Sequence, residues 1–392
     1  MKVERSLSRD TTIPWSAVLS MTFCVALLLA SEFMPVSLLT PIAQGLGVTA
    51  GQTGQAIAIS GFFAMMSALI IPTLAGRVNR KYVLVTMAAC QLLSLLVMAV
   101  TPNFLILMVA RTLLGVAVGG FWALATSTIM RLVPDGKVTQ ALGVMYMGQA
   151  IASAFAAPLG SFLGGLIGWR GVFEALVPLV MVNLIWMWIA LPSLPSKDRI
   201  LLRDLGQLLK RKYFLFGMIA MALTFGGAFT MFTYLRPYLE QKAGLNTDQL
   251  SLMFLVLGCA GFVGSPIGSR IAENHVLILL KMVPAIMGAV TLALLWSGSS
   301  EILTAFLLFM WGAANPALSI GWMGWMSQNV KDQPEAAGSL MVAIIQGAIL
   351  LGSYLGGELL NNTGIPGAFI GSVVLLLMAL SVLAQGRRVL LS

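Results

Sequence analysis

Residues 33–76 read FMPVSLLTPIAQGLGVTAGQTGQAIAISGFFAMMSALIIPTLAG and contain no charged residue. A helix that crosses the hydrocarbon core of a bilayer needs about 20 mostly apolar residues, so this stretch is too long for one crossing. Prolines and glycines near its start predict a turn there. These turn residues are Pro35, Pro41, Gly45 and Gly47. The stretch therefore predicts the end of one membrane helix, a turn and a complete second membrane helix.

The rest of the 392-residue chain has the same character. It is 58% hydrophobic and only 9% charged, whereas a soluble domain carries about 25% charged residues. So few charges cannot cover a surface that faces water, and lipid must cover much of the chain. Lys2, Arg5 and Arg9 precede a first apolar segment that is too long for a cleavable signal. We expect this segment to stay in place as the first membrane helix.

The net charge of +9 does not indicate nucleic-acid binding. Binding to phosphates along a nucleic acid requires a basic face. Here the basic residues form short clusters between long apolar stretches. Contact with anionic lipid explains the excess better, so we expect membrane lipid and not nucleic acid as a partner.

Charged and turn residues divide the chain into twelve segments of membrane-spanning length. We therefore predict an all-α membrane protein with twelve transmembrane helices. The predicted spans are 15–39, 52–75, 82–101, 104–130, 139–165, 170–192, 213–238, 248–272, 276–298, 302–328, 335–360 and 365–386.

The distribution of lysine and arginine predicts the orientation. If the N-terminus is cytoplasmic, nearly all of the basic residues between spans lie on one side, and Arg170, Arg236 and Lys242 lie on the other. Because cytoplasmic loops carry an excess of lysine and arginine, both termini are expected in the cytoplasm. The cytoplasmic set comprises the N-terminal tail, Arg77, Arg80, Lys81, Arg131, Lys137, the 193–212 segment, Arg270, Lys281, Lys331, Arg387 and Arg388.

The longest polar interruption, 193–212, divides the twelve spans into six and six. We predict an N-terminal six-helix bundle in residues 1–192, a cytoplasmic linker in 193–212 and a C-terminal six-helix bundle in 213–392. The halves resemble each other weakly, because SRIAENHVLI at 269–278 is similar to GRVNRKYVLV at 76–85. Such a repeat predicts a binding site between the halves, near the middle of the membrane.

Three motifs resemble those of the major facilitator superfamily, and the resemblance covers the full length of the chain. GRVNRK at 76–81 is similar to that family's signature loop, although Gly76 replaces the usual acidic residue and Asn79 the usual glycine. RTLLGVAVGG, which begins at Arg111, resembles its intramembrane arginine motif. AAPLGSFLGGLIGWR at 156–170 resembles the antiporter motif of exporters, with Ala157 in place of a glycine.

The resemblance implies proton-linked export of a drug or metabolite. Four stretches look closest to the bacterial purine ribonucleoside efflux pumps, and sugar or amphenicol-type drug efflux is the alternative. These stretches are SEFMPVSLLTPIAQGLGV, GGFWALATSTIMRLVP, FTYLRP and EAAGSLMVAIIQ. The resemblance also implies a gating loop with Arg77, Arg80 and Lys81, and an antiporter motif with Pro158, Gly160 and Gly164. The positive-inside rule alone would also explain the three basic residues.

Among the charged residues within predicted spans are Glu32, Arg111, Glu174 and Glu358. Charges in hydrocarbon are costly and usually functional. At 1.5 Å rise per residue, Glu32 and Arg111 lie at the same depth, about 10 Å below the periplasmic surface. The resemblance places both of their helices on the central cavity. We therefore expect Glu32 to carry the coupling proton and Arg111 to interact with it; the alternative is a static buried pair.

Polar and aromatic residues on neighbouring spans suggest where a substrate binds. Flat rings and amides would suit a nucleobase through stacking and hydrogen bonds to its edge. The candidates are Trp122, Tyr146, Gln149, Asn315, Trp322 and Gln346. Each of them could instead pack or bond between helices.

Other classes of protein fit the sequence less well. A membrane-embedded enzyme would need a catalytic motif, and neither HExxH, GxSxG nor a Walker loop is present. Cys24, Cys90 and Cys259 lie in apolar stretches without metal-binding spacing, and the only histidine, His275, lies beside a charged loop. We expect no metal and no cofactor. A monomer that exchanges protons for a small-molecule substrate would be sufficient.

Overall fold

The computed structural model describes residues 13–76, 78–134, 137–195, 202–297, 300–330 and 332–385. Within these residues the secondary structure is helical, with no strand. The helices are α1 (Trp15–Ser37), α2 (Leu39–Leu46), α3 (Ala50–Leu74), α4 (Arg80–Val100), α5 (Phe104–Leu132), α6 (Val138–Ala190), α7 (Leu202–Leu209), α8 (Lys212–Phe232), α9 (Leu235–Gln241), α10 (Thr247–Trp296), α11 (Glu301–Asn329) and α12 (Pro334–Ala384).

Nine helical segments in the described residues are long and apolar enough to cross a membrane. Three of them, α6, α10 and α12, have 53, 50 and 51 residues. At 1.5 Å rise per residue each would measure about 75 Å if straight, more than twice the hydrocarbon core of a bilayer. The protein is therefore an all-helical membrane protein in which three helices must bend back.

Each long helix is interrupted at one residue with non-helical backbone angles. Gly168 in α6 and Gly364 in α12 both have φ of 73°, a conformation that glycine adopts without strain because it has no Cβ. In α10 the break falls at His275, which is exposed, with φ −139° and ψ 49°. These breaks fall where the predicted spans 139–165 and 170–192, 248–272 and 276–298, and 335–360 and 365–386 adjoin.

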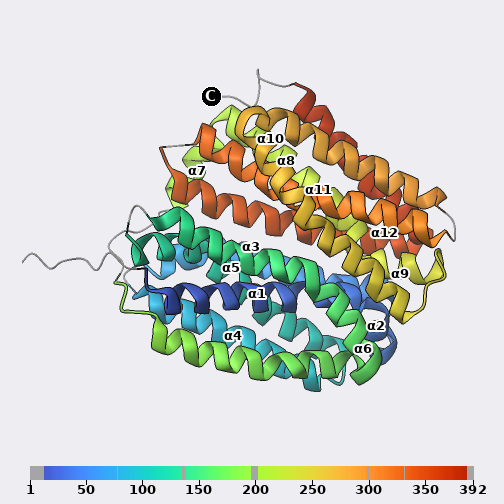
Figure 1. The fold of residues 1–392 in the computed structure, drawn as a ribbon, viewed down its shortest axis with the longest axis horizontal. Helices are drawn as coiled ribbons and strands as arrows, with labels where there is room; N and C mark the ends of the chain where they lie inside the picture. The colour runs from blue at the N-terminus through green and yellow to red at the C-terminus, as the bar shows by residue number, and fades with distance from the viewer. Residues whose placement is uncertain are drawn as a thin grey trace, which may run out of the picture.

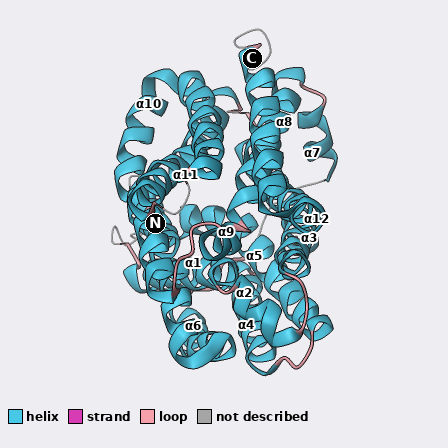
Figure 2. Cartoon of the chain, turned by 90° about the vertical axis from the view of Figure 1, so that its right-hand side faces the viewer, coloured by secondary structure: helices cyan, strands magenta, loops and turns pink. Residues whose placement is uncertain are grey.

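The helices run roughly side by side, with the two halves of the chain on opposite sides (Figure 1). Figure 2 shows the same bundle from its right-hand end. Two hydrophobic cores consist only of residues up to Leu191, whereas the third consists mainly of residues from Leu208 onward. Phe33 packs against all three cores. The C-terminal part of α1 is thus one place where the separately packed halves meet.

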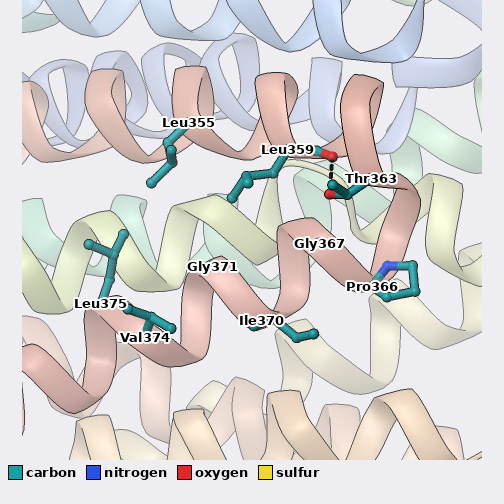
Figure 3. A pocket seen from close by; sticks show the side chains of 9 residues that line it. All are labelled: Leu355, Leu359, Thr363, Pro366, Gly367, Ile370, Gly371, Val374 and Leu375. Atoms are coloured by element: carbon teal, nitrogen blue, oxygen red, sulfur yellow. Dashed lines mark hydrogen bonds between the residues drawn. The ribbon is translucent and has the colours of Figure 1, made fainter.

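Much of the outer surface is apolar. Ile189 and Ile302 are 75% and 86% exposed, as expected for side chains that face lipid. A groove beside the break in α12 belongs to this surface (Figure 3). It is lined mainly by aliphatic residues such as Leu355 and Ile370, and the hydroxyl of Thr363 donates internally to the carbonyl of Leu359. The groove therefore has no charged group that could orient a polar solute.

Three short helices refine the sequence-based expectations. The turn predicted between the first two spans contains α2, which ends at Gly47 in the left-handed conformation. The segment 193–212 contains α7, and residues 196–201 of that segment lie outside the described residues. The predicted span 213–238 is divided into α8 and α9.

Close contact between α3 and α5 generates a stability prediction. A Cβ at Gly115 of α5 would overlap the carbonyl oxygen of Ser60, whereas one at Gly143 of α6 would meet nothing within 4 Å. We expect Gly115→Ala to lower the free energy of unfolding by about 1–3 kcal/mol. Gly143→Ala should raise it by up to about 1 kcal/mol, because alanine favours a helix. Thermal melting in detergent measures both, and equal stability of the two variants would contradict the packing.

Candidate functional site

Arg111 lies within α5 and is 1% exposed. Its Nε donates to the carbonyl of Ala56 on α3 at 3.1 Å, and its Nη1 donates to the carbonyl of Ser31 on α1 at 3.1 Å. A guanidinium within the hydrocarbon region is costly unless it has such partners. The side chain of Arg111 therefore ties α1, α3 and α5 together.

Glu32 follows Ser31 on α1 and is 5% exposed. It interacts electrostatically with Arg111, and its carboxylate lies beside the amide of Gln346 on α12. No N–O contact within 4.0 Å joins Glu32 to Arg111, both of which are among the described residues. The two are charged neighbours rather than a direct ion pair. The structure thus brings Glu32 and Arg111 together and adds Gln346 from the other half of the chain.

Two hydrogen-bonding atoms in this group have no partner among the described residues. They are the Nη2 donor of Arg111 and the Oε1 acceptor of Gln346, and both are enclosed. Buried polar atoms in folded proteins nearly always have partners, so such exceptions require an explanation. Here they leave a donor and an acceptor available beside the Glu32 carboxylate.

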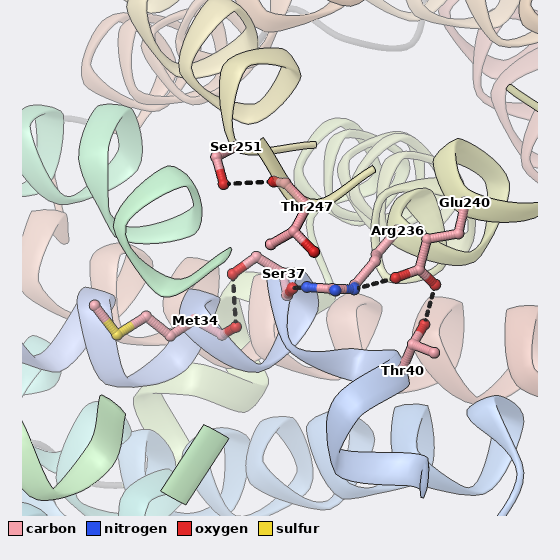
Figure 4. Close-up of polar contacts among 7 residues, drawn as sticks. All are labelled: Met34, Ser37, Thr40, Arg236, Glu240, Thr247 and Ser251. Atoms are coloured by element: carbon pink, nitrogen blue, oxygen red, sulfur yellow. Dashed lines mark hydrogen bonds and ion pairs between the residues drawn. The ribbon is translucent and has the colours of Figure 1, made fainter. Parts of the chain in front are cut away.

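A polar network joins the halves where α1 and α2 meet α9 (Figure 4). Arg236 of α9 donates from Nη1 to the carbonyl of Ser37, and from Nε to Glu240 at 2.7 Å. The hydroxyl of Thr40 on α2 donates to the other carboxylate oxygen of Glu240 at 2.5 Å. We call these four residues the Arg236 network. Because its partners lie about 200 positions apart in sequence, the network holds the halves together at this end.

An aromatic cluster also bridges the halves. The ring of Phe33 on α1 lies 6.4 Å from that of Phe229 and 6.2 Å from that of Phe232, both on α8. Phe232 in turn stacks on Trp311 of α11 at 5.5 Å, with 6° between the ring planes. We call these four residues the Phe33 cluster. Sequence reasoning missed Phe33, Phe229 and Phe232, and the only available signal was that Phe33 follows Glu32.

The predicted substrate residues are divided among separate places. Trp122 of α5 stacks on Tyr146 of α6 at 5.9 Å, and the Tyr146 hydroxyl lies 3.3 Å from that of Thr126. In the C-terminal half, Trp322 packs edge-on against Trp325 at 5.7 Å. The remaining candidates are Gln149 and Asn315, which are partly buried, and Gln346 beside Glu32. Of these candidates, Gln346 is the one whose contacts in the described residues include Glu32.

A second ion pair lies at the opposite end of the C-terminal half. Arg211 donates to both carboxylate oxygens of Asp332, at 3.0 Å and 2.5 Å. These hydrogen bonds hold the pKa of the Asp332 carboxyl below its usual value. The side chains of Arg211 and Asp332 are more exposed than those of Arg236 and Glu240. Both residues belong to the C-terminal half, so this pair does not connect the halves.

Comparison with known proteins identifies the family. The family model described as Major Facilitator Superfamily matches residues 21–347, which is most of the chain. The chain belongs to the major facilitator superfamily. Membership of this family makes it a multi-pass membrane transporter and not an enzyme, which confirms the sequence-based expectation for both.

Several curated relatives of this facilitator are similar over nearly their whole length. It is 40% identical over 375 residues to the purine ribonucleoside efflux pump NepI of Salmonella paratyphi B, covering 95% of this chain and 94% of that protein. It is 42% identical over 371 residues to the transcription regulatory protein OpdE of Pseudomonas aeruginosa, covering 93% and 92%.

Solved structures show the same fold at low sequence identity. A bacterial homologue of the human lysosomal transporter Spinster, in an inward-facing and occupied conformation, matches this facilitator with a TM-score of 0.79. The two chains are 13% identical, and the match covers 95% of this chain and 96% of the other. Its inward-facing and unoccupied conformation matches with a TM-score of 0.73 at 15% identity.

The loop that resembles the family's signature loop is hydrogen-bonded to residues just after the end of α6. The amide of Asn79 donates to Ser193 at 2.6 Å, and its carbonyl oxygen accepts the backbone N–H of Leu194 at 2.9 Å. The backbone N–H of Arg80, whose side chain is buried, donates to the Leu194 carbonyl at 3.0 Å. The ammonium of Lys81 lies 5.4 Å from the ring centre of Trp188. Arg77, the third residue predicted in the loop, lies outside the described residues.

The stretch 156–170, which resembles the antiporter motif, lies on the first part of α6, against the end of α1. Positions Gly160 and Gly164 face Ser37 and Leu38: a Cβ at Gly160 would lie 2.7 Å from the Ser37 hydroxyl, and one at Gly164 would overlap the Leu38 side chain. Pro158 lies inside the same part of the helix. The motif therefore adjoins Ser37, whose carbonyl accepts the hydrogen bond from Arg236.

The Arg236 network generates a second stability prediction. Arg236→Met should leave the partly buried carboxylate of Glu240 without its cation, and we expect a loss of about 3 kcal/mol in the free energy of unfolding. Arg211→Met breaks an exposed pair and should cost at most about 1 kcal/mol. Thermal melting of both variants in detergent measures the difference. An equal loss for the two arginines would show that the network does not hold the halves together.

Proposed function

We propose that this protein exports purine nucleosides and related small polar metabolites across the bacterial inner membrane in exchange for protons. Two observations support the proposal. Relatives that are 40% identical over nearly the whole chain are named purine ribonucleoside efflux pumps. In addition, the described residues place a buried carboxylate beside a buried guanidinium at the meeting point of the halves. The second observation carries the proton-coupling part of the proposal.

The proposed architecture has twelve spans in two bundles of six. If each of the three interrupted helices crosses the membrane twice, the nine helical segments provide nine plus three, or twelve, crossings. The separate cores on either side of the 193–212 segment support bundles in residues 1–192 and 213–392. An even number of crossings puts both termini on the same side. The excess of lysine and arginine at that end makes this side the cytoplasm.

Glu32 is the proposed proton carrier. An ionised carboxylate within the hydrocarbon region is costly, and a nearby guanidinium offsets part of that cost. Because Arg111 is already bonded to Ser31 and Ala56, it stays in place and supports Glu32 without a direct ion pair. When the halves move apart, Gln346 moves away from Glu32. This movement would then change the proton affinity of Glu32.

Alternating access requires the halves to separate at one end while they close at the other. In this structure the Arg236 network closes the end at which α1 meets α9. With both termini in the cytoplasm, this end faces the periplasm. We propose that the network opens when substrate leaves the cell and closes again on the return step.

The name of one relative, a transcription regulatory protein, is compatible with transport. A transporter that lowers the internal concentration of a solute changes the activity of any regulator that binds the solute. Efflux of sugars or amphenicol-type drugs is the alternative within the same family. Measuring whether proteoliposomes carry purine nucleosides, sugars or amphenicols distinguishes these solutes.

Proteoliposomes with an acidic lumen test the proposal. Wild-type protein should accumulate labelled adenosine, because protons leaving the lumen drive nucleoside entry, and an uncoupler should abolish accumulation. Glu32→Gln keeps the shape of the side chain but removes the titratable group. It should exchange adenosine for adenosine, which needs no net proton movement, and should fail to accumulate it. Glu174→Gln, at an exposed position on α6, is the matched control and should behave as wild type.

Accumulation by folded Glu32→Gln at the wild-type rate would contradict the assignment of Glu32. Wild-type accumulation that is unchanged by the uncoupler would contradict proton coupling itself. If purine nucleosides are not carried, but sugars or amphenicols are, the proposed substrate is wrong and the alternative holds.

A further inference from the structure

The Phe33 cluster is an aromatic contact between the halves. Phe33 is the next residue after Glu32 on α1 and is only partly buried. Its ring lies against the rings of Phe229 and Phe232, which meet each other edge-on at 5.7 Å. Aromatic faces stack readily on other flat rings. The N-terminal half thus contributes the ring of Phe33, and the C-terminal half contributes the rings of Phe229 and Phe232. Phe33 follows the proposed proton carrier directly in sequence.

Trp311, which stacks on Phe232, adds a hydrogen-bond donor to these rings. The residue is 1% exposed, and its Nε1 has no hydrogen-bond partner among the described residues. An indole N–H can only donate, and a buried tryptophan usually finds an acceptor for it. Because leaving a buried donor unpaired is unfavourable, its presence here points to a partner that is bound only in another step of the cycle.

Two further unpaired atoms of complementary kinds lie on residues that interact with Glu32. Gln346 has an unpaired acceptor and Arg111 an unpaired donor. With the Trp311 N–H, these atoms are two donors and one acceptor, and Phe33 of the aromatic cluster is the residue next to Glu32 in sequence. A heteroaromatic ring with acceptors and donors on its edge matches both features, whereas a sugar offers no aromatic face.

We propose that the base of a purine nucleoside binds between Phe33 and the Phe229–Phe232 pair, and that Trp311 donates its N–H to a ring acceptor of that base. This inference rests on the proposed function and names the residues that would select its substrate. Entry of the base separates Phe33 from α8 as the halves open, and it exposes the Trp311 N–H to the ligand. Since Glu32 adjoins Phe33 on α1, occupancy of this site moves the carboxylate relative to Gln346.

A packing role for the Phe33 cluster makes a different prediction. If the four residues only fill the core between the halves, substituting them should lower stability without changing which bases are recognised. A recognition role requires a change in the discrimination between bases that differ in a single ring atom.

The test compares Trp311→Phe with wild type in adenosine exchange across proteoliposomes. Phenylalanine keeps an aromatic ring but removes the N–H. We expect the half-saturating adenosine concentration to rise about fivefold to tenfold, as for the loss of one hydrogen bond, with little change in the maximal rate. Trp186→Phe is the matched control, because that indole is only partly buried and its N–H already donates to Ser16 at 2.9 Å.

Analogues of adenosine that lack one ring nitrogen identify the acceptor. We test 1-deaza-, 3-deaza- and 7-deazaadenosine. One of them should bind wild type as weakly as adenosine binds Trp311→Phe. That analogue should bind Trp311→Phe no more weakly than it binds wild type. Unchanged affinity and unchanged discrimination in folded Trp311→Phe would overturn the proposal. If the variant fails to fold, Phe33→Leu replaces it: weaker binding of every purine nucleoside supports the site, and unchanged binding overturns it. Absence of adenosine exchange by wild type would instead contradict the proposed function.

Discussion

The guanidinium of Arg111 is the interaction on which the rest of the site depends. A permanent positive charge among apolar helices requires partners, and it finds them in the backbone carbonyls of Ser31 and Ala56. Those bonds fix α1 and α3 against α5. They also place Glu32, the residue after Ser31, within electrostatic reach of the same charge. The hydrogen bonds that Arg111 makes to Ser31 and Ala56 therefore determine where the Glu32 carboxylate lies.

From this fixed point the N-terminal half meets the C-terminal half through three kinds of contact. Gln346 reaches Glu32, Phe33 contacts the rings of α8, and Ser37 at the end of α1 accepts the hydrogen bond of Arg236. All three use residues within two turns of one helix, at the C-terminal end of α1. A movement of α1 relative to α8 and α12 would change the surroundings of the Glu32 carboxylate. It would change the Phe33 cluster and the Arg236 network at the same time. This geometry suits a carrier in which proton and substrate occupy neighbouring positions.

Much of this could be predicted from the sequence, because it depends on local composition. Stretches without charged residues predicted the helical segments. Counting residues from the ends of the predicted spans placed Glu32 and Arg111 at the same depth in the membrane. Contacts between distant helices were not predictable: the bond from Arg236 to Ser37 spans 199 positions, and nothing in either segment indicates the other. The Phe33 cluster was missed for the same reason, since phenylalanines in an apolar helix look like lipid-facing residues. Trp122 and Trp322 were selected on ring type and spacing, and the structure places them in separate aromatic pairs.

The central claim is that substrate and proton are linked through Glu32. By reciprocity, a nucleoside that binds best when Glu32 is ionised must displace a proton from the protein. The most direct measurement adds adenosine to weakly buffered, detergent-solubilised protein across a series of pH values and follows the pH with an indicator dye. Wild type is expected to release protons on binding, and Glu32→Gln is expected to bind adenosine without releasing them. Adenosine binding to wild type with no proton release at any pH in the series would contradict it.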